Sequence, residues 1–86
     1  MSNTLSYPEL AALIQARAGV VIDPAALERP GAAFDEFGVD SLGLLGVVGE
    51  LENRHGVKVT NGAESAKTPA EFLDLVNAVV TAKAGA

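Results

Sequence analysis

The residues best suited to chemistry form one short stretch, Gly38-Val39-Asp40-Ser41-Leu42. Within it, Ser41 follows an acid and stands where a loop gives way to an apolar run with helical spacing. One interpretation is that Ser41 caps this helix, because a serine hydroxyl can accept a hydrogen bond from an unpaired N–H of the first turn. Another is that Ser41 carries a phosphate ester, since a helix N-terminus suits an anion. These five residues alone leave both interpretations open.

The side chains that would make Ser41 an enzymatic nucleophile are absent from the sequence. The chain has no cysteine and one histidine, His55, at the far end of the predicted helix. Because a helix rises roughly 1.5 Å per residue, the two would lie about 20 Å apart, too far for a nucleophile and its base. Asp35, Glu36 and Asp40 lack the spacing of a cation-binding loop. We therefore expect neither a catalytic site nor a metal site.

The composition indicates one small domain spanning residues 1–86, with about 7–83 ordered. Hydrophobic residues make up 49% of the chain with few aromatics, which favours a helical bundle. Eleven acids against six bases give a net charge of −5, which argues against nucleic acid and favours basic protein partners. The first residues do not resemble a signal peptide, and no apolar run approaches the ~18 residues of a membrane span. We expect a soluble, cytoplasmic monomer.

Apolar periodicity and capping residues predict three main helices, over residues 7–18, 41–55 and 69 to about 83. The first and last begin with capping boxes, Ser6 to Glu9 and Thr68 to Glu71. The predicted buried residues of the central helix are Leu44, Leu45, Val47, Val48 and Leu51. Those of the last helix are Phe72, Leu73, Val76, Val79 and Val80.

The segments between these helices carry weaker signals. Residues 23–27 predict a single helical turn, and Phe34 and Phe37 should pin the remaining loop to the core. Residues 63–67 predict a very short helix whose only apolar side chains are alanines. We expect this helix to pack loosely and residues 60–67 to be mobile, because few buried contacts imply low local stability.

Beyond the central stretch, several motifs together resemble an acyl carrier protein. They are Phe34 to Leu42, Glu50-Leu51-Glu52, His55-Gly56-Val57 and Thr68-Pro69. The resemblance runs from about Glu9 to Val80 and implies an all-α, four-helix bundle of three main helices plus a short helix III, with a long loop between helices I and II. In that family the serine carries 4′-phosphopantetheine, from coenzyme A, through a phosphodiester. The resemblance gives this role to Ser41, flanked by Asp40 and Leu42. It implies a non-catalytic carrier in which the reactive thiol belongs to the attached arm.

Finer features resemble the carriers of discrete, type II polyketide synthases, as in antibiotic biosynthesis. These features are Leu44-Leu45, Glu50-Leu51-Glu52 and Phe72 to Asn77. Gly46 stands where a glutamate is often found, which points away from fatty-acid carriers, and the sequence before Ser41 differs from that of peptide-synthetase carriers. Both types stay as alternatives. So does a protein of another class, a non-covalent helical adaptor in which Ser41 is only a cap.

The resemblance also implies partners and a cargo site. The partners are a phosphopantetheinyl transferase, ketosynthase/chain-length factor, acyltransferase, ketoreductase and other synthase enzymes. Expected partner-binding residues are Glu36, Asp40, Leu42, Gly46, Glu50 and Glu52. Expected residues of an acyl-chain pocket are Leu45, Val48, Val76, Asn77 and Val80.

Two features of the sequence allow opposing interpretations. Gly43, Gly46 and Gly49 lie along one helix face and either reflect drift in a well-packed helix or let a partner approach closely. Asn77 either lies at the boundary of the core or hydrogen-bonds a carbonyl of the acyl chain.

Overall fold

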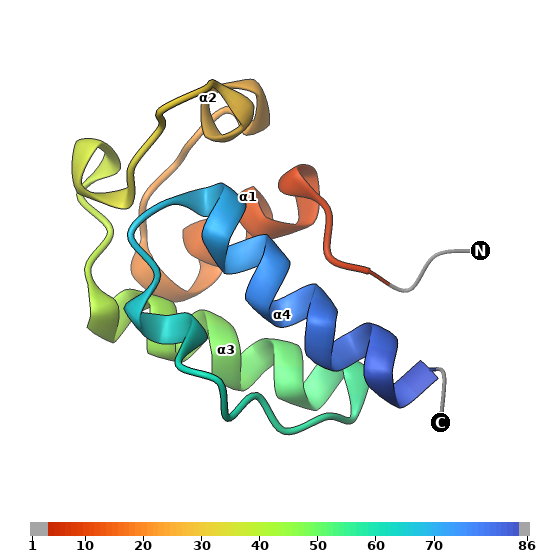
Figure 1. The fold of residues 1–86 in the computed structure, drawn as a ribbon. Coiled ribbons are helices and arrows are strands. Elements are labelled where there is room, and N and C mark those ends of the chain that lie inside the picture. Colours follow the sequence, from red (N-terminus) through yellow and green to blue (C-terminus); the bar gives the residue numbers. More distant parts are fainter. Residues whose placement is uncertain (1–3, 85–86) are drawn as a thin grey trace.

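The computed structural model describes residues 4–84, and their side chains up to residue 82. All regular elements in this part of the chain are helices (Figure 1). Its elements are α1 (Tyr7–Ala18), α2 (Pro24–Glu28), the 3₁₀ turn η1 (Phe34–Phe37), α3 (Ser41–His55), the 3₁₀ turn η2 (Ala63–Ser65) and α4 (Pro69–Ala84). The predicted fold class and the bounds of the first two long helices are confirmed. The short helix III is a single 3₁₀ turn. The sequence analysis expects order to about residue 83; α4 continues to Ala84, and residues 85–86 lie outside the described residues.

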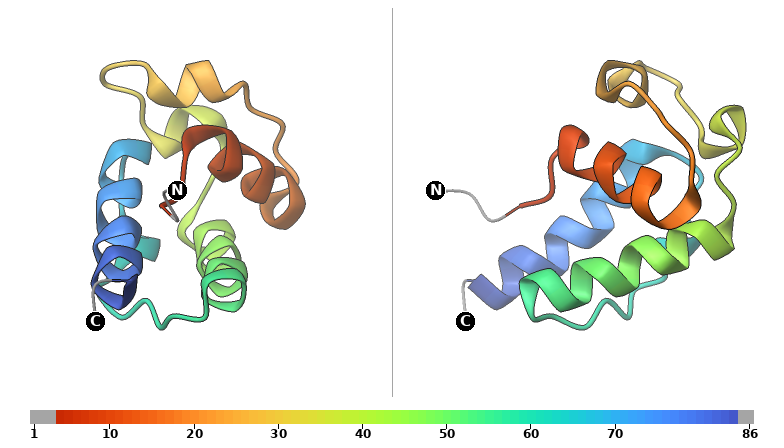
Figure 2. Two further views of the ribbon diagram at one scale, coloured as in Figure 1. Left: turned by 90° about the vertical axis from the view of Figure 1, so that its right-hand side faces the viewer. Right: turned by 180° about the vertical axis from the view of Figure 1, so that it is seen from behind.

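The three long helices form the bundle, and the two shorter elements of the long loop close one end of it (Figures 1 and 2). Helix α1 packs against α3, and η2 lies against both α3 and α4. Helix α2 contacts both α1 and α4. Of the described helices, none is long and apolar enough to cross a membrane.

Local capping explains where α1 begins and ends. The Ser6 hydroxyl accepts a hydrogen bond from the Glu9 N–H at 3.3 Å. Gly19 ends the helix in the left-handed conformation, with φ of 73°, a position that favours glycine. The Glu9 carboxylate lies instead near Arg54 and His55 of α3, at 3.7 and 3.8 Å. Only the serine half of the predicted capping box is therefore formed, and Glu9 links α1 to the end of α3.

The long loop is anchored by aromatic packing, as predicted. Phe34 is 2% exposed, and its ring meets Phe72 of α4 edge to face, with centroids 5.9 Å apart. Phe37 packs against the same core from a half-buried position. The loop therefore has a fixed course to the start of α3.

The expectation of a loosely packed η2 is wrong. Ala63 is completely buried and Ala66 is 7% exposed. Small side chains let the turn's backbone come close to α3 and α4, so no bulky residue is needed to close the gap. The preceding loop is held too, because Asn61 Nδ2 donates to the Leu75 carbonyl at 2.8 Å. The mobility of residues 60–67 stays a prediction.

Asn77 of α4 holds the segment before α1. Its Oδ1 accepts from the Leu5 N–H at 2.6 Å, and its Nδ2 donates to the Leu5 carbonyl at 3.2 Å. The Leu5 side chain is 3% exposed. The ordered core thus begins before residue 7. Asn77 is half-buried at the boundary of the core and both ends of its amide bind the backbone of Leu5, while its place in an acyl-chain pocket stays a prediction.

The glycines of α3 have two different surroundings. A Cβ at Gly43 would lie 3.1 Å from the Ala18 Cβ, and one at Gly46 would lie 3.4 Å from the Arg17 Cβ. A Cβ at Gly49 would meet nothing within 4 Å. Gly43 and Gly46 therefore let α1 approach α3 closely, since the side chains at a contact set the distance between helices. Neither sequence drift nor contact with a partner protein describes Gly43 and Gly46. For Gly49 both interpretations stay predictions.

We predict opposite effects of substitutions at Gly43 and Gly49 on the free energy of unfolding. Gly43→Val should lower it by about 1–3 kcal/mol, because the added methyl groups crowd Ala18. Gly49→Ala should raise it by up to about 1 kcal/mol, since alanine is the better helix former and has room there. Urea unfolding followed by circular dichroism measures both. Equal effects at the two positions would contradict the close α1–α3 contact.

Candidate functional site

The site forms where α3 begins, and its first helical residue is Ser41. Asp40 is the N-cap, because its Oδ1 accepts from the Gly43 N–H at 2.8 Å. The interpretation of Ser41 as the cap is therefore wrong: the cap lies one residue earlier. Since aspartate and serine are both good caps, the sequence Asp-Ser did not distinguish them. This arrangement leaves the serine hydroxyl free of a capping role.

Ser41 is accessible. It is exposed, and its hydroxyl makes no hydrogen bond to any residue that the structure describes. Beside it is a hollow of about 330 Å³ between η1, the start of α3 and the segment around η2. The residues that line it are Phe34, Asp35, Val39, Asp40, Ser41, Leu44, Glu64, Ser65, Ala66 and Lys67. A group attached to Ser41 would have open space on this side.

These surroundings fit a phosphopantetheine arm. A phosphodiester needs an accessible hydroxyl, and Ser41 supplies one on the first turn of a 15-residue helix, where an anion is favoured. The hollow combines apolar walls from Phe34, Leu44 and Ala66 with polar side chains, as an arm of methylene and amide groups requires. His55 lies at the other end of α3, so it does not form a nucleophile–base pair with Ser41.

Two leucines on α3 are exposed near Ser41. Leu42 is 75% exposed, as expected for a residue on the side opposite the core. Leu45 is 52% exposed, whereas the sequence placed it in the buried face and in the acyl-chain pocket. The predicted burial is wrong because Leu45 lies at the edge of the broad apolar face, beyond the part that α1 and η2 cover; its place in an acyl-chain pocket stays a prediction. Three residues apart, Leu42 and Leu45 are neighbours on the helix surface.

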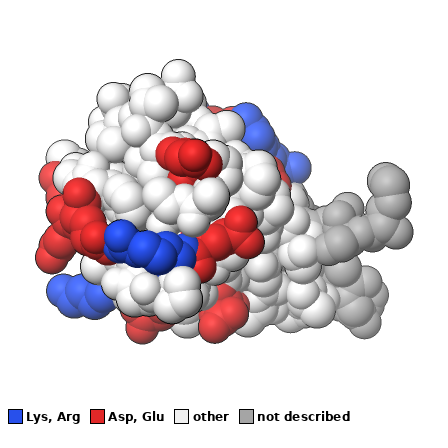
Figure 3. All heavy atoms as spheres, turned by 90° about the horizontal axis from the view of Figure 1, so that it is seen from above, with Lys and Arg blue, Asp and Glu red and all other residues white. Residues whose placement is uncertain are grey.

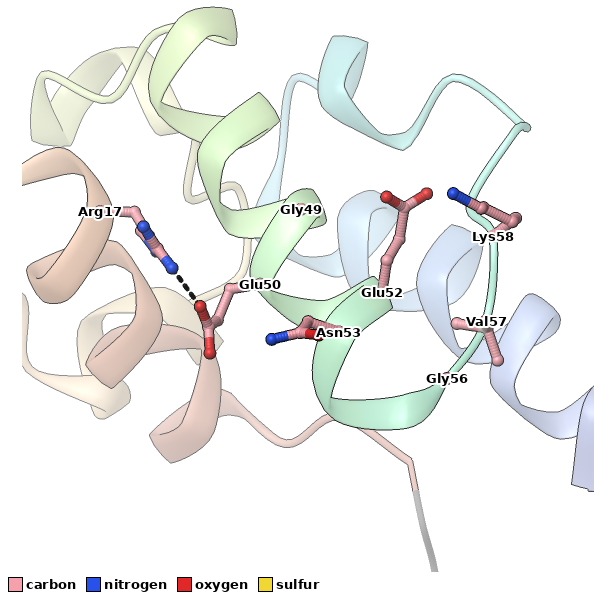
Figure 4. A pocket seen from close by; sticks show the side chains of 8 residues that line it. All are labelled: Arg17, Gly49, Glu50, Glu52, Asn53, Gly56, Val57 and Lys58. Carbon is pink, nitrogen blue, oxygen red and sulfur yellow. Dashed lines mark hydrogen bonds and ion pairs between the residues drawn. The ribbon is translucent and has the colours of Figure 1, made fainter.

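The acid Glu50, expected to meet partners, is engaged within the chain. Arg17 of α1 bonds its Oε1 (Figure 4), and Arg54 Nε lies 3.3 Å from its Oε2. These hydrogen bonds, from Arg17 first and then from Arg54, hold the pKa of Glu50 below its usual value. Its carboxylate is thus neutralised by two guanidinium groups.

Gly46, another expected partner contact, is half-buried under Arg17. The end of α1 lies over this side of α3, at Gly46 as at Glu50, and the partner-binding role of both residues stays a prediction. Glu52, on the far side of the hollow in Figure 4, accepts from the Val59 N–H at 2.8 Å and so holds the loop after α3. Gly49 is exposed and lies at the edge of a hollow of about 550 Å³.

Three further acids lie near Ser41: Asp35 and Glu64 line the hollow beside it, and Glu36 follows Asp35 in η1. Glu36 accepts from the Ala33 N–H at 2.8 Å and is bonded by Arg29; these hydrogen bonds, that of Arg29 first, lower the pKa of its carboxyl. Asp35 and Glu64 form no ion pair with any described residue. Seen from above the bundle, basic side chains lie directly against acidic ones (Figure 3). Asp35 and Glu64 therefore keep their charge near Ser41, as the exposed Glu28 and Asp74 do elsewhere on the described surface.

Three valines of the predicted acyl-chain pocket are core residues. Val48, Val76 and Val80 are at most 4% exposed and belong to one continuous hydrophobic cluster. The hollow beside Ser41 reaches this cluster through Leu44, Val39 and Ala66. The residues of this hollow that the sequence analysis did not predict are those of η2 and the Phe34 and Asp35 side chains of η1. The residues of η2 lie far from Ser41 along the chain, and no local pattern reveals that they meet it.

Comparison with known proteins identifies the family. Residues 8–76 match the family described as "Phosphopantetheine attachment site", and the chain belongs to it. It is 51% identical over 81 residues to a "Probable acyl carrier protein" of Streptomyces halstedii, covering 93% of this chain and 88% of that protein. It is 49% identical over 80 residues to the "Curamycin polyketide synthase acyl carrier protein" of Streptomyces cyaneus, covering 93% and 92%.

Among solved structures, the fold is similar to the NMR structure of a 3,5-dioxohexyl ACP, described as a triketide mimic, from the actinorhodin polyketide synthase of Streptomyces coelicolor. The TM-score is 0.76 at 29% identity, with 95% of this chain and 98% of that chain covered. The all-helical architecture is thus shared with a polyketide carrier at modest sequence identity.

We predict that the cap and the serine contribute unequally to stability. Asp40→Ala should lower the free energy of unfolding by about 1 kcal/mol, because the Gly43 N–H loses its acceptor. Asp40→Asn, the matched control, should be close to wild type, since asparagine caps equally well. Ser41→Ala should change it by less than about 0.5 kcal/mol, as for a surface residue. A larger loss for Ser41→Ala than for Asp40→Ala would restore the serine as the cap.

We predict that Arg17→Gln raises the pKa of Glu50 more than Arg54→Gln does, because the Arg17 hydrogen bond is the larger cause of its lowering. A carboxyl pKa below its unfolded value means that the contribution to stability is present at neutral pH and is lost as the pH falls through the folded value. Carboxyl ¹³C NMR titration of the three proteins measures this. An unchanged Glu50 titration in Arg17→Gln would contradict the contact between α1 and α3.

Proposed function

We propose that this chain carries growing acyl or polyketide chains as thioesters on a 4′-phosphopantetheine arm, and that Ser41 is the attachment residue. The observation that carries the proposal is the accessible, unbonded Ser41 hydroxyl on the first turn of α3, at the edge of a hollow, in a member of the phosphopantetheine-attachment family. The curamycin relative, at 49% identity, favours polyketide over fatty-acid or peptide cargo.

The chemical roles divide between the arm and the chain. The arm, when attached, supplies the thiol that forms the thioester. The chain's own residues hold the attachment point: Asp40 caps α3, and Phe34 anchors the preceding loop. The chain presents its cargo, and separate enzymes perform the reactions.

The proposed partners meet the α3 end that carries Ser41. We expect a phosphopantetheinyl transferase first, and then ketosynthase/chain-length factor, acyltransferase and ketoreductase. Leu42 and Leu45 would supply apolar contact, with Asp35 and Asp40 as nearby acids that steer basic partners. Glu36, Glu50, Glu52 and Gly46 have the internal contacts described above, so we assign them a smaller share of this surface.

The decisive experiment is intact-mass measurement after incubation with coenzyme A and a phosphopantetheinyl transferase. We predict a mass increase of one arm in the wild type and in Ser65→Ala, the matched control, and no increase in Ser41→Ala. Ser65 also lines the hollow but belongs to η2. A folded wild type that gains no mass would favour the non-covalent adaptor. A mass increase of one arm in Ser41→Ala would show that the attachment residue is not Ser41.

We predict that Leu42→Ala lowers kcat/KM for transferase or synthase turnover about tenfold, the loss of a contact of about 1.4 kcal/mol. Its unfolding free energy should stay near that of the wild type, because the side chain is 75% exposed. Val21→Ala is the control, since Val21 is 78% exposed but lies in the loop after α1. Equal kinetics for Leu42→Ala and Val21→Ala would remove Leu42 from the docking surface.

A further inference from the structure

One charged side chain beside Ser41 has no role in the fold. Lys67 lines the same hollow as Ser41, and it is the one basic residue among the described residues that do so. Its side chain is exposed and forms no ion pair or hydrogen bond with any described residue. The acids that line the hollow are Asp35, Asp40 and Glu64.

The backbone of Lys67 is fixed although its side chain is free. Its N–H donates to Glu71 Oε1 at 2.9 Å, which ties it to the first turn of α4. Its carbonyl accepts from the Phe34 N–H at 3.0 Å, which ties it to η1. Phe34 itself is buried, and so is the neighbouring Ala66. The lysine therefore extends from a rigid point at the junction of η1, η2 and α4, beside the start of α3.

Attachment of an arm changes the charge of this hollow. A phosphodiester on Ser41 adds one negative charge to a surface that already carries three carboxylates and a single ammonium. Like charges that line one hollow repel each other, and an opposite charge relieves the repulsion. A lysine is a flexible point charge with three donors, suited to a phosphate whose position is set by another bond.

From this juxtaposition of Ser41 and Lys67 across one hollow, we propose that the Lys67 ammonium binds the phosphodiester of the arm attached to Ser41. The contact directs the first part of the arm along the hollow toward η2, over Leu44 and Ala66, and away from the exposed side of α3. This inference rests on the proposed function, since it concerns the group that Ser41 would carry.

The test uses the arm-loaded full-length protein in four forms: wild type, Lys67→Gln, Lys67→Glu and Lys58→Gln. Lys58 is the matched control, because it is an exposed lysine that lines the other hollow, at the far end of α3. Mass spectrometry first confirms loading, and ¹H–¹⁵N spectra confirm the fold. The ³¹P resonance of the phosphodiester and nuclear Overhauser contacts between the Lys67 Hε protons and the arm are then measured.

We expect the wild type and Lys58→Gln to share one ³¹P shift and relaxation rate, with Overhauser contacts between Lys67 and the arm. Lys67→Gln and Lys67→Glu should lose this ³¹P shift, and the phosphate should relax as a more mobile group. High salt should move the wild-type signal in the same direction, because an exposed ion pair is screened.

The same ³¹P signal in the wild type and Lys67→Gln would overturn this inference and leave the carrier function intact. So would an equal change in Lys58→Gln, because it would reflect overall charge. A wild type that takes up no arm would overturn the carrier function and this inference with it.

Discussion

The close contact between α1 and α3 is the constraint on which the rest of the structure depends. Gly43 and Gly46 present no side chain to Ala18 and Arg17, so the two helices can approach at the point where α3 begins. This contact sets the direction of α3 and therefore the position of its first turn. Asp40 fixes that turn from the other side by accepting from the Gly43 N–H. Ser41 needs no structural bond of its own and is left exposed.

The same contact divides the charges of the molecule. Arg17 reaches Glu50, which also meets Arg54, so the second half of α3 is internally compensated. Asp35 and Glu64, which form no ion pair with any described residue, lie instead beside the hollow at Ser41. The packing that positions Ser41 therefore engages Glu50, whereas these two acids near Ser41 keep their charge uncompensated within the described chain.

Periodicity and capping signals predicted the long helices, because these depend on neighbours in sequence: the stop at Gly19 and the start at Ser41 are local features. Interactions between distant residues were not predictable. Nothing near Asn77 indicates that it binds the Leu5 backbone, and nothing near Glu50 indicates Arg17. The burial of η2 was missed because two alanines form a weak apolar signal, although a close backbone makes bulk unnecessary. The motif around Ser41 pointed to the proposed attachment residue, whereas no local pattern indicated the hollow beside it.

Comparison of backbone amide chemical shifts before and after attachment of the phosphopantetheine arm tests most directly whether the α1–α3 contact holds the site in place. If the α1–α3 contact and the Asp40 cap already hold the site in place, shifts should change at Ser41, Leu42 and the residues of η2 that line the hollow. The amides of Ala18 and Gly46, at the contact itself, should keep their positions. Changes at Ala18 and Gly46 as large as those around Ser41 would contradict the account, because loading would then rearrange the contact on which the site is proposed to depend.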